Sequence, residues 1–344
     1  MYFCRIIDYI IFVVQMRIGE SSFSLAISEN RIALMGLSML SILLFHQYYT
    51  SIIPFNFFHN FGNWGVDVFL FLSGMGLVNS LKKYTLKVFY LRRFFRLFPS
   101  CILCGTFRFF LILLLGSFSV LLKEKLNYSL WTLASLDLWF IHTIIILYTI
   151  SPILYWLLNK WPLPIIIVIL SLYFINGFVC TPIVGIDWMS PLGIASWTIE
   201  RLPVFAFGML ISIGNIRVPS RISLYAFFLI IAVCMVLIGK VRITIIGLQT
   251  LIYISVAFGM PALIYLLLRI VRMTPTVILQ SLNFMGAYSL EIYLVHEFIF
   301  WVLQVVYING NPCFLLPLSF LLSCFSAYLC KRVTTLLMSY SSWR

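Results

Sequence analysis

The stretch LWFIHTIIILYTISPIL, residues 138–154, contains no Asp, Glu, Lys or Arg in 17 residues. It belongs to an apolar run from 131 to 158, and a helix needs about 20 such residues to cross the hydrocarbon core of a bilayer. Apolar and polar residues do not alternate along it, as they would in a strand of a membrane barrel. The stretch therefore predicts a transmembrane helix.

The same pattern recurs along the chain, with runs separated by breakers such as Pro54, Pro162 and Asn311. Apolar runs of spanning length lie at 31–50, 64–81, 97–122, 131–158, 162–180, 196–214, 221–239, 244–268, 280–305 and 312–337. They predict an all-α fold, a polytopic membrane helical bundle of about ten transmembrane helices.

The composition excludes the soluble classes. The 344 residues are 62% hydrophobic and only 10% charged, with a mean hydropathy of +1.07, whereas soluble proteins are about a quarter charged. We expect an interfacial N-terminal segment at 1–30, the bundle at 31–337 and a cytoplasmic tail at 338–344.

The net charge of +13 would indicate nucleic acid in a soluble protein, but here its distribution follows the loops. If the first span runs outward, seventeen of the 23 Lys and Arg residues lie inside and four lie outside. Because basic residues concentrate in cytoplasmic loops, both termini are expected in the cytoplasm. We expect membrane lipids, and no nucleic acid, as partners.

Eight cysteines are present, mostly inside apolar spans, where thiols act as small hydrophobic groups. The pair Cys101 and Cys104 lacks the second pair or the histidines that a zinc site needs. The sequence predicts no metal site.

Ionisable side chains inside membrane spans are costly, so each is a candidate functional residue. His46 and His296 lie at similar depths in the outer half of their spans, by a helical rise of 1.5 Å per residue. Asp67 and Arg201 lie near the outer ends of their spans, and Glu291 lies about one turn deeper than His296. A polar cluster of these groups is geometrically possible.

The alternative is that each histidine forms a hydrogen bond that holds two helices together. For His142, which has hydrophobic neighbours and no carboxylate assigned as its partner, we favour this packing role.

A second concentration of charge is FYLRRFFRLFPS, residues 89–100, with Arg92, Arg93 and Arg96. Arginine binds phosphate through two parallel hydrogen bonds, and residues four apart share a helical face. These arginines therefore favour a phosphate site. The alternative is that they only set the topology and contact anionic lipids.

Several segments together resemble acyltransferase family 3, membrane proteins that transfer acyl groups, usually acetyl, onto carbohydrates. The similar segments follow the family's order and are LMGLSMLSILLFH (34–46), GVDVFLFLSGMGL (65–77), YLRRFFRLFP (90–99), LWFIHTIIILYTISPIL (138–154), RLPVFAFGML (201–210) and MGAYSLEIYLVH (285–296). The resemblance implies an O-acyltransferase of the bacterial cytoplasmic (inner) membrane that uses acetyl-CoA and no metal. Its acceptor would be a hydroxyl of a cell-surface or lipid-linked carbohydrate.

Transfer from a thioester to a hydroxyl needs a base and a grip on the phosphates of the donor. The resemblance makes His46 the base, since histidine titrates near neutral pH, with Asp67 orienting it. Arg92, Arg93 and Arg96 would bind acetyl-CoA from the cytoplasm. The remaining candidates would bind or orient substrate: Arg201, Glu291 and His296. Whether His46 is transiently acetylated or acts only as a base stays open.

The chain departs from the family at one position. The first family helix usually carries an arginine eleven residues before its histidine, and here that residue is Met35. Arg31 lies one turn earlier on the same face. Its long side chain makes it the candidate to replace the missing donor-binding arginine.

Two other classes of function compete with this interpretation. A transporter or flippase of a lipid-linked glycan would use the same buried ionisable groups, but such proteins usually contain repeated halves and paired broken helices, which this sequence lacks. A scaffold without chemistry would leave the buried histidines and the arginine segment unexplained.

The charge asymmetry predicts which loops face outward. On a background without native cysteines, Cys introduced at Lys123 or Lys240 should react with a membrane-impermeant maleimide in intact cells, because both lie in predicted outer loops. Cys at Arg217 should react only after the membrane is permeabilised. Labelling of position 217 in intact cells would overturn the orientation.

Overall fold

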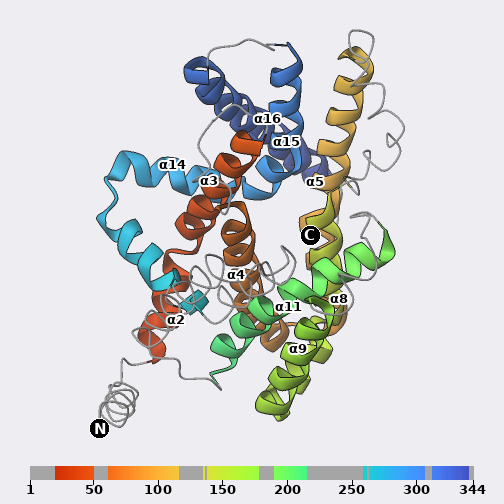
Figure 1. The fold of residues 1–344 in the computed structure, drawn as a ribbon, viewed down its shortest axis with the longest axis vertical. Coiled ribbons are helices and arrows are strands. Elements are labelled where there is room, and N and C mark those ends of the chain that lie inside the picture. The colour runs from red at the N-terminus through yellow and green to blue at the C-terminus, as the bar shows by residue number, and fades with distance from the viewer. Residues whose placement is uncertain are drawn as a thin grey trace, which may run out of the picture. The chain divides into compact units, whose positions relative to one another are not determined.

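The computed structural model describes residues 20–49, 61–115, 135, 138–177, 190–214, 259–261, 263–306 and 312–340. Within these ranges all regular secondary structure is helical, which confirms the predicted all-α class. The helices are α2 (Glu20–Glu29), α3 (Arg31–Tyr49), α4 (Phe61–Lys83), α5 (Leu86–Leu115), α8 (Trp139–Lys160), α9 (Pro162–Ile175), α11 (Pro191–Ile213), α14 (Thr276–Ala287), α15 (Ser289–Val306) and α16 (Pro312–Tyr340) (Figure 1).

Five helices in the described part are long and apolar enough to cross a membrane: Gly62–Lys83, Leu86–Leu111, Trp139–Lys160, Pro191–Ile213 and Cys313–Leu336. The bent pair Phe23–Glu29 and Arg31–Gln47, with an angle of 70° between its halves, makes up to six. The chain is thus an integral membrane protein by composition and helix length.

Two predicted spans, 221–239 and most of 244–268, lie outside the described residues. The same holds for residues 1–19 of the predicted interfacial segment and for residues 341–344 of the predicted tail. The total of about ten spans and the cytoplasmic termini therefore stay predictions.

The basic segment belongs to the same helix as the apolar run that follows it. We expected a span from 97 to 122, but α5 begins at Leu86, with only two residues between it and the end of α4 at Lys83. Pro99 lies inside α5. The charged side chains of Lys and Arg can extend from a helix end toward water, so charge near a span does not end the helix.

The predicted span 280–305 consists of two helices. α14 ends at Ala287 and α15 begins at Ser289, with Tyr288 as a turn between them. The hydrogen-bond ladder continues across the break, because Tyr288 N–H donates to the Phe284 carbonyl and Ile292 N–H donates to the Tyr288 carbonyl. The apolar pattern continues through this break, so nothing in the sequence pattern indicates that the helix is interrupted at Tyr288.

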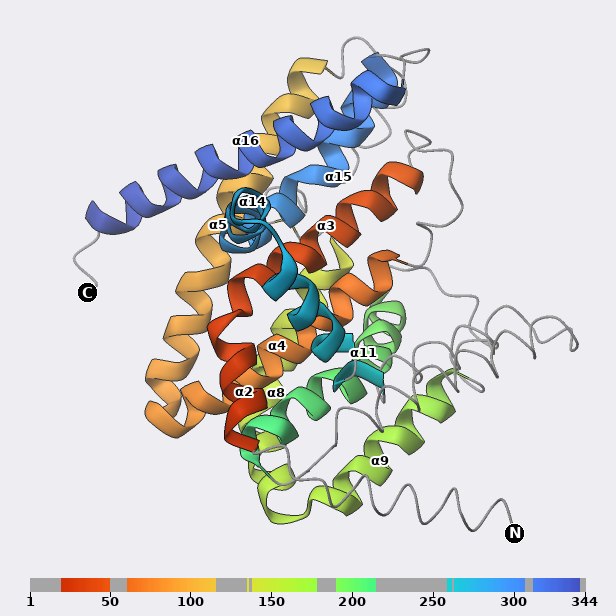
Figure 2. The same ribbon diagram turned by 90° about the vertical axis from the view of Figure 1, so that its left-hand side faces the viewer.

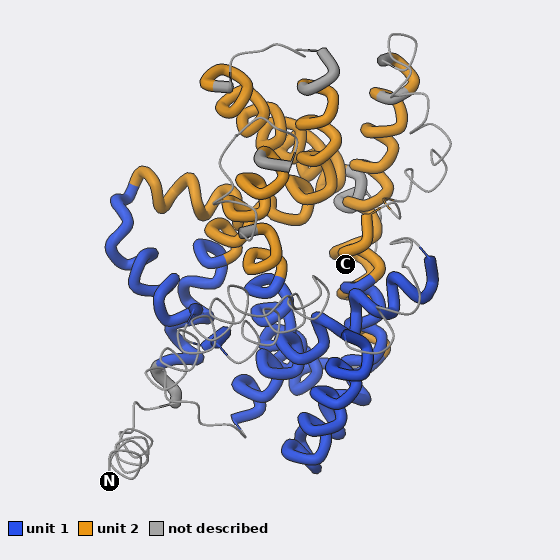
Figure 3. Tube along the Cα trace, in the orientation of Figure 1, with its two compact units in different colours: residues 1–34, 67–86, 143–276 blue, residues 35–66, 87–142, 277–344 orange. Residues whose placement is uncertain are grey.

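The described chain forms two compact units (Figure 3): residues 1–34, 67–86 and 143–276 form unit 1, and residues 35–66, 87–142 and 277–344 form unit 2. In unit 1, α4 and α11 approach closely at two glycines. A side chain on Gly74 would meet the Phe205 carbonyl oxygen, and one on Gly208 would meet the Phe71 carbonyl oxygen. Small residues at such contacts let membrane helices pack backbone to backbone.

In unit 2, α15 and α16 pack side by side (Figures 1 and 2). The buried side of α15 includes Ile292, Val295, Ile299 and Phe300. Gln47 of α3 donates to the Ser319 hydroxyl of α16 over 2.7 Å and to the Leu316 carbonyl over 3.3 Å. These contacts fix α3 against the helix pair.

The glycine contact predicts a stability effect. Gly208→Ala should lower the thermal unfolding temperature of the purified protein, because the new methyl group collides with the α4 backbone and overpacking costs about 1–3 kcal/mol. Ala195→Leu, at an exposed position of the same helix, is the matched control and should change little. Equal unfolding temperatures for Gly208→Ala and the wild type would contradict the close packing.

Candidate functional site

Two histidines from distant parts of the sequence meet in unit 2. His46 lies near the end of α3, and His296 lies in the second turn of α15. His296 Nε2 is 3.1 Å from His46 Nδ1, and the rings meet edge to face with centroids 4.7 Å apart. His296 is 1% exposed, whereas His46 is half-buried, so His46 is the more accessible of the two.

The hydrogen bonds fix which ring nitrogens carry protons. His296 Nδ1 lies 3.0 Å from the Ile292 carbonyl oxygen and 2.8 Å from that of Tyr293, so it must be the N–H donor. In the neutral ring, His296 Nε2 is then an acceptor. His46 Nδ1 faces this acceptor and the Ile42 carbonyl oxygen at 3.0 Å, so it carries the proton. The basic lone pair of His46 is consequently on Nε2.

Aromatic rings surround the histidine pair. Phe45 packs edge to face on His46 with centroids 4.9 Å apart, and Phe300 packs on His296 at 5.6 Å. Tyr293 lies 5.5 Å from the His296 ring. These apolar rings lower the local dielectric, which strengthens the hydrogen bond between the two imidazoles.

A buried ion pair joins α4 and α11 in unit 1. Arg201 Nη1 donates to Asp67 Oδ1 over 2.8 Å, and the side chains are each 1% exposed. Arg201 also lies over the Trp197 ring at 5.7 Å. Within the described residues no hydrogen-bond donor reaches Asp67 Oδ2. That oxygen is therefore a buried acceptor that the described residues leave unused.

The sequence predicted that Asp67 orients His46. The structure gives Asp67 an arginine partner in unit 1 and gives His46 a histidine partner in unit 2. Orientation of His46 by Asp67 therefore stays a prediction, and His296 is the orienting group that the described residues supply.

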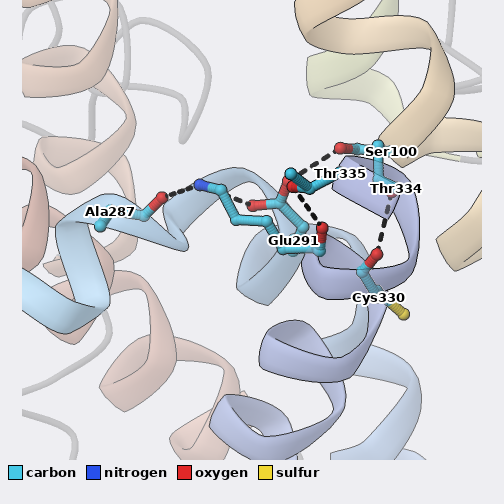
Figure 4. A network of polar contacts seen from close by, with 7 residues as sticks. Ser100, Ala287, Glu291, Cys330, Thr334 and Thr335 are labelled. Carbon is cyan, nitrogen blue, oxygen red and sulfur yellow. Dashed lines mark hydrogen bonds and ion pairs between the residues drawn. The ribbon is translucent and has the colours of Figure 1, made fainter. Parts of the chain in front are cut away.

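Glu291 lies on α15, like His296, but its side chain contacts α5 and α16 (Figure 4), whereas that of His296 contacts α3. Its Oε1 accepts a hydrogen bond of 2.8 Å from the Ser100 hydroxyl of α5, and its Oε2 lies 3.8 Å from Lys331 Nζ of α16. Arg108 of α5 is buried and donates to the Leu294 carbonyl over 3.1 Å. Sequence reasoning did not assign a role to Ser100, Arg108 or Lys331, although a charged residue within a span, such as Arg108, is itself a signal.

The arginines of the basic segment lie along the first turns of α5. Arg92 and Arg96 are exposed, and Arg93 is half-buried with its guanidinium carbon 5.6 Å from the centre of the Phe89 ring. Two exposed guanidinium groups one turn apart can bind an anion together.

The other two candidates lie elsewhere. Arg31 belongs to unit 1, where its guanidinium lies against Gly76 of α4; the structure does not describe its position relative to the arginines of α5. His142 is half-buried on α8.

Among the described residues, no three His, Cys, Asp or Glu side chains form a group that could hold a metal ion. The polar groups that the structure brings together are hydrogen-bonding and charged side chains suited to proton transfer and anion binding.

Comparison with known proteins gives one match. A family described as an acyltransferase domain matches residues 33–332, which includes both helices of the histidine pair, the ion pair and the basic segment. No curated protein and no solved structure matches the chain. The match covers most of the 344 residues, and the chain therefore belongs to the acyltransferase 3 family of membrane proteins.

Proposed function

We propose that the protein transfers an acetyl group from acetyl-CoA to a hydroxyl of a cell-surface or lipid-linked carbohydrate in the bacterial cytoplasmic membrane. The observation that carries the proposal is the histidine pair, in which the contact with His296 places the basic lone pair of His46 on Nε2. A base of this kind is what acyl transfer to a hydroxyl needs.

In the proposed reaction, His46 Nε2 removes the proton of the acceptor hydroxyl as its oxygen attacks the thioester carbonyl. The C–S bond then breaks, and the CoA thiolate takes the proton back from His46 Nε2. The Nδ1–H of His46 keeps its contacts with His296 Nε2 and the Ile42 carbonyl throughout. The imidazolium therefore forms without breaking a hydrogen bond.

Arg92, Arg93 and Arg96 would hold the donor phosphates, because the exposed guanidinium groups of Arg92 and Arg96 lie one turn apart and suit a diphosphate. In the predicted topology these residues face the cytoplasm, where acetyl-CoA is made. The pantetheine arm would then reach into the bundle and meet a carbohydrate entering from outside.

The acceptor would use the ion pair of unit 1. Asp67 Oδ2 is buried and receives no hydrogen bond from the described residues, so it can accept one from a sugar hydroxyl. Arg201 holds the other carboxylate oxygen and so fixes the orientation of the Asp67 carboxylate for this role.

The proposal predicts that His46→Ala abolishes acetylation while the protein stays folded and inserted. Loss of a general base typically lowers the rate by roughly 10²–10⁴. The rate is measured as transfer from radiolabelled acetyl-CoA to the glycan, with base-labile esters counted on the glycan of cells that express each variant. Near-normal ester formation by His46→Ala would contradict the assignment of His46 as the general base.

Two further histidine variants serve as controls. His142→Ala should be mild, because loss of a packing hydrogen bond between membrane helices costs only about 0.6 kcal/mol on average. His296→Ala should lower the rate less than His46→Ala does, since it removes the group that orients the base.

The donor site makes a separate prediction. Arg92→Ala/Arg96→Ala should weaken acetyl-CoA binding strongly, because two charge-assisted hydrogen bonds of about 1.5–3 kcal/mol each are lost. Binding is measured by titration of the purified protein in lipid nanodiscs. Lys83→Ala, an exposed cation at the end of α4, is the control, and equal small effects at all positions would mean a diffuse lipid-binding surface.

A further inference from the structure

A cation of α16 lies at the break between α14 and α15. Lys331 Nζ donates to the carbonyl oxygen of Ala287, the last residue of α14. It lies 3.8 Å from Glu291 Oε2 and 4.8 Å from the centre of the Tyr288 ring. The side chain is 38% exposed, so an anion from outside the protein can reach the ammonium group.

The carboxylate beside this cation is rigidly held. The Glu291 side chain is 5% exposed, and the Ser100 hydroxyl donates to its other oxygen over 2.8 Å (Figure 4). An ammonium group has three N–H donors. Among the described residues the Ala287 carbonyl takes one of them, and Glu291 Oε2 at 3.8 Å is an ion-pair partner beyond hydrogen-bond distance. N–H donors therefore remain for a ligand.

Ser100 connects this cation to the basic segment. Arg96 lies four residues before Ser100 in the same helix, so it is about 6 Å away along the axis and on the same face. The Ser100 hydroxyl contacts Glu291 of α15, which lies beside Lys331 of α16. Arg96 shares the face of α5 on which Ser100 lies, so we infer that its side chain leaves α5 on the side where Lys331 lies. The side chains of Arg and Lys are long enough to converge on one anion across such a distance.

We propose that Lys331 binds a phosphate ester together with Arg96, and that Glu291 and Ser100 are positioning residues for its ammonium group. Acyl-CoA is the source of the phosphate if the proposed function holds, and this part of the inference rests on that function. The headgroup of an anionic lipid is the other source with the same chemistry.

The experiment measures binding of CoA to the protein in phosphatidylcholine nanodiscs, with pantetheine as the ligand that lacks phosphate. Lys331→Met should weaken CoA binding by about tenfold or more and leave pantetheine binding unchanged. Lys331→Arg should keep CoA binding within about threefold, because the charge remains. Arg332→Met is the matched control, since Arg332 is exposed, lies next in the same helix and contacts Tyr328.

A double variant separates binding from folding. Lys331→Met alone leaves the Glu291 charge buried without its cation, which can destabilise the fold. Lys331→Met/Glu291→Gln removes both charges and keeps a hydrogen-bonding group for Ser100. If Lys331 binds phosphate, the double variant should recover its unfolding temperature but bind CoA as weakly as the single variant.

The source of the phosphate is read in a second arm, in which phosphatidylglycerol is added to the nanodiscs and its stabilisation of the fold is measured. If the double variant binds CoA as the wild type does but is no longer stabilised by phosphatidylglycerol, the phosphate site is supported and its ligand is the lipid headgroup. Wild-type binding of both ligands by the double variant would overturn the inference. A wild-type protein that binds no CoA would instead refute the donor assigned under the proposed function, and the lipid arm would still decide the role of Lys331.

Discussion

The hydrocarbon core of a bilayer contains no water, so a polar side chain inside it must find its partner in the protein. In both units this constraint selects which helices pack together. Asp67 binds Arg201 from 134 residues away, and His46 binds His296 from 250 residues away. Apolar contact cannot make this choice, because lipid tails are as apolar as the side chains of a neighbouring helix.

The pairing of α4 with α11 shows how polar and small residues act together. The ion pair of Asp67 and Arg201 lies near one end, and the reciprocal glycine contacts follow about two turns along each helix. Ser212 of α11 then donates to Asn79 of α4 over 3.2 Å. The contacts advance in the same order along both helices, so α4 and α11 run parallel, as expected for two even-numbered spans of the predicted topology.

Uninterrupted apolar runs predicted most of the helices in the described part, but not α2, which lies before the first run, and not the helix ends. The start of α5 was missed because the arginines lie before the predicted apolar run that begins at residue 97, although long basic side chains can extend from a helix to water. The turn at Tyr288 was missed because it lies in an apolar segment without proline. Helix ends of this kind depend on contacts with other helices, such as the one from Lys331 to Ala287.

The candidate site was predictable residue by residue but not as a set of contacts. The cost of burying charge singled out His46, His296, Asp67, Arg201 and Glu291. Their partners depend on which helices are neighbours, and that information is not local in sequence. Lys331 was counted only as a topological charge, and Ser100 carries no signal of its own because serine is common in membrane helices.

The helix α15 links the polar network at Lys331 to the histidine pair. Glu291 and His296 are five residues apart on it, about 7.5 Å along the axis. The Leu294 carbonyl between them accepts a hydrogen bond from buried Arg108. A general base must lie within hydrogen-bond reach of the proton that it removes, and the position of His46 depends on a contact of 3.1 Å with His296. A slide of α15 by a single residue, about 1.5 Å, would break that contact, so the bonds that anchor α15 to α5 and α16 also keep His46, the proposed base, in place.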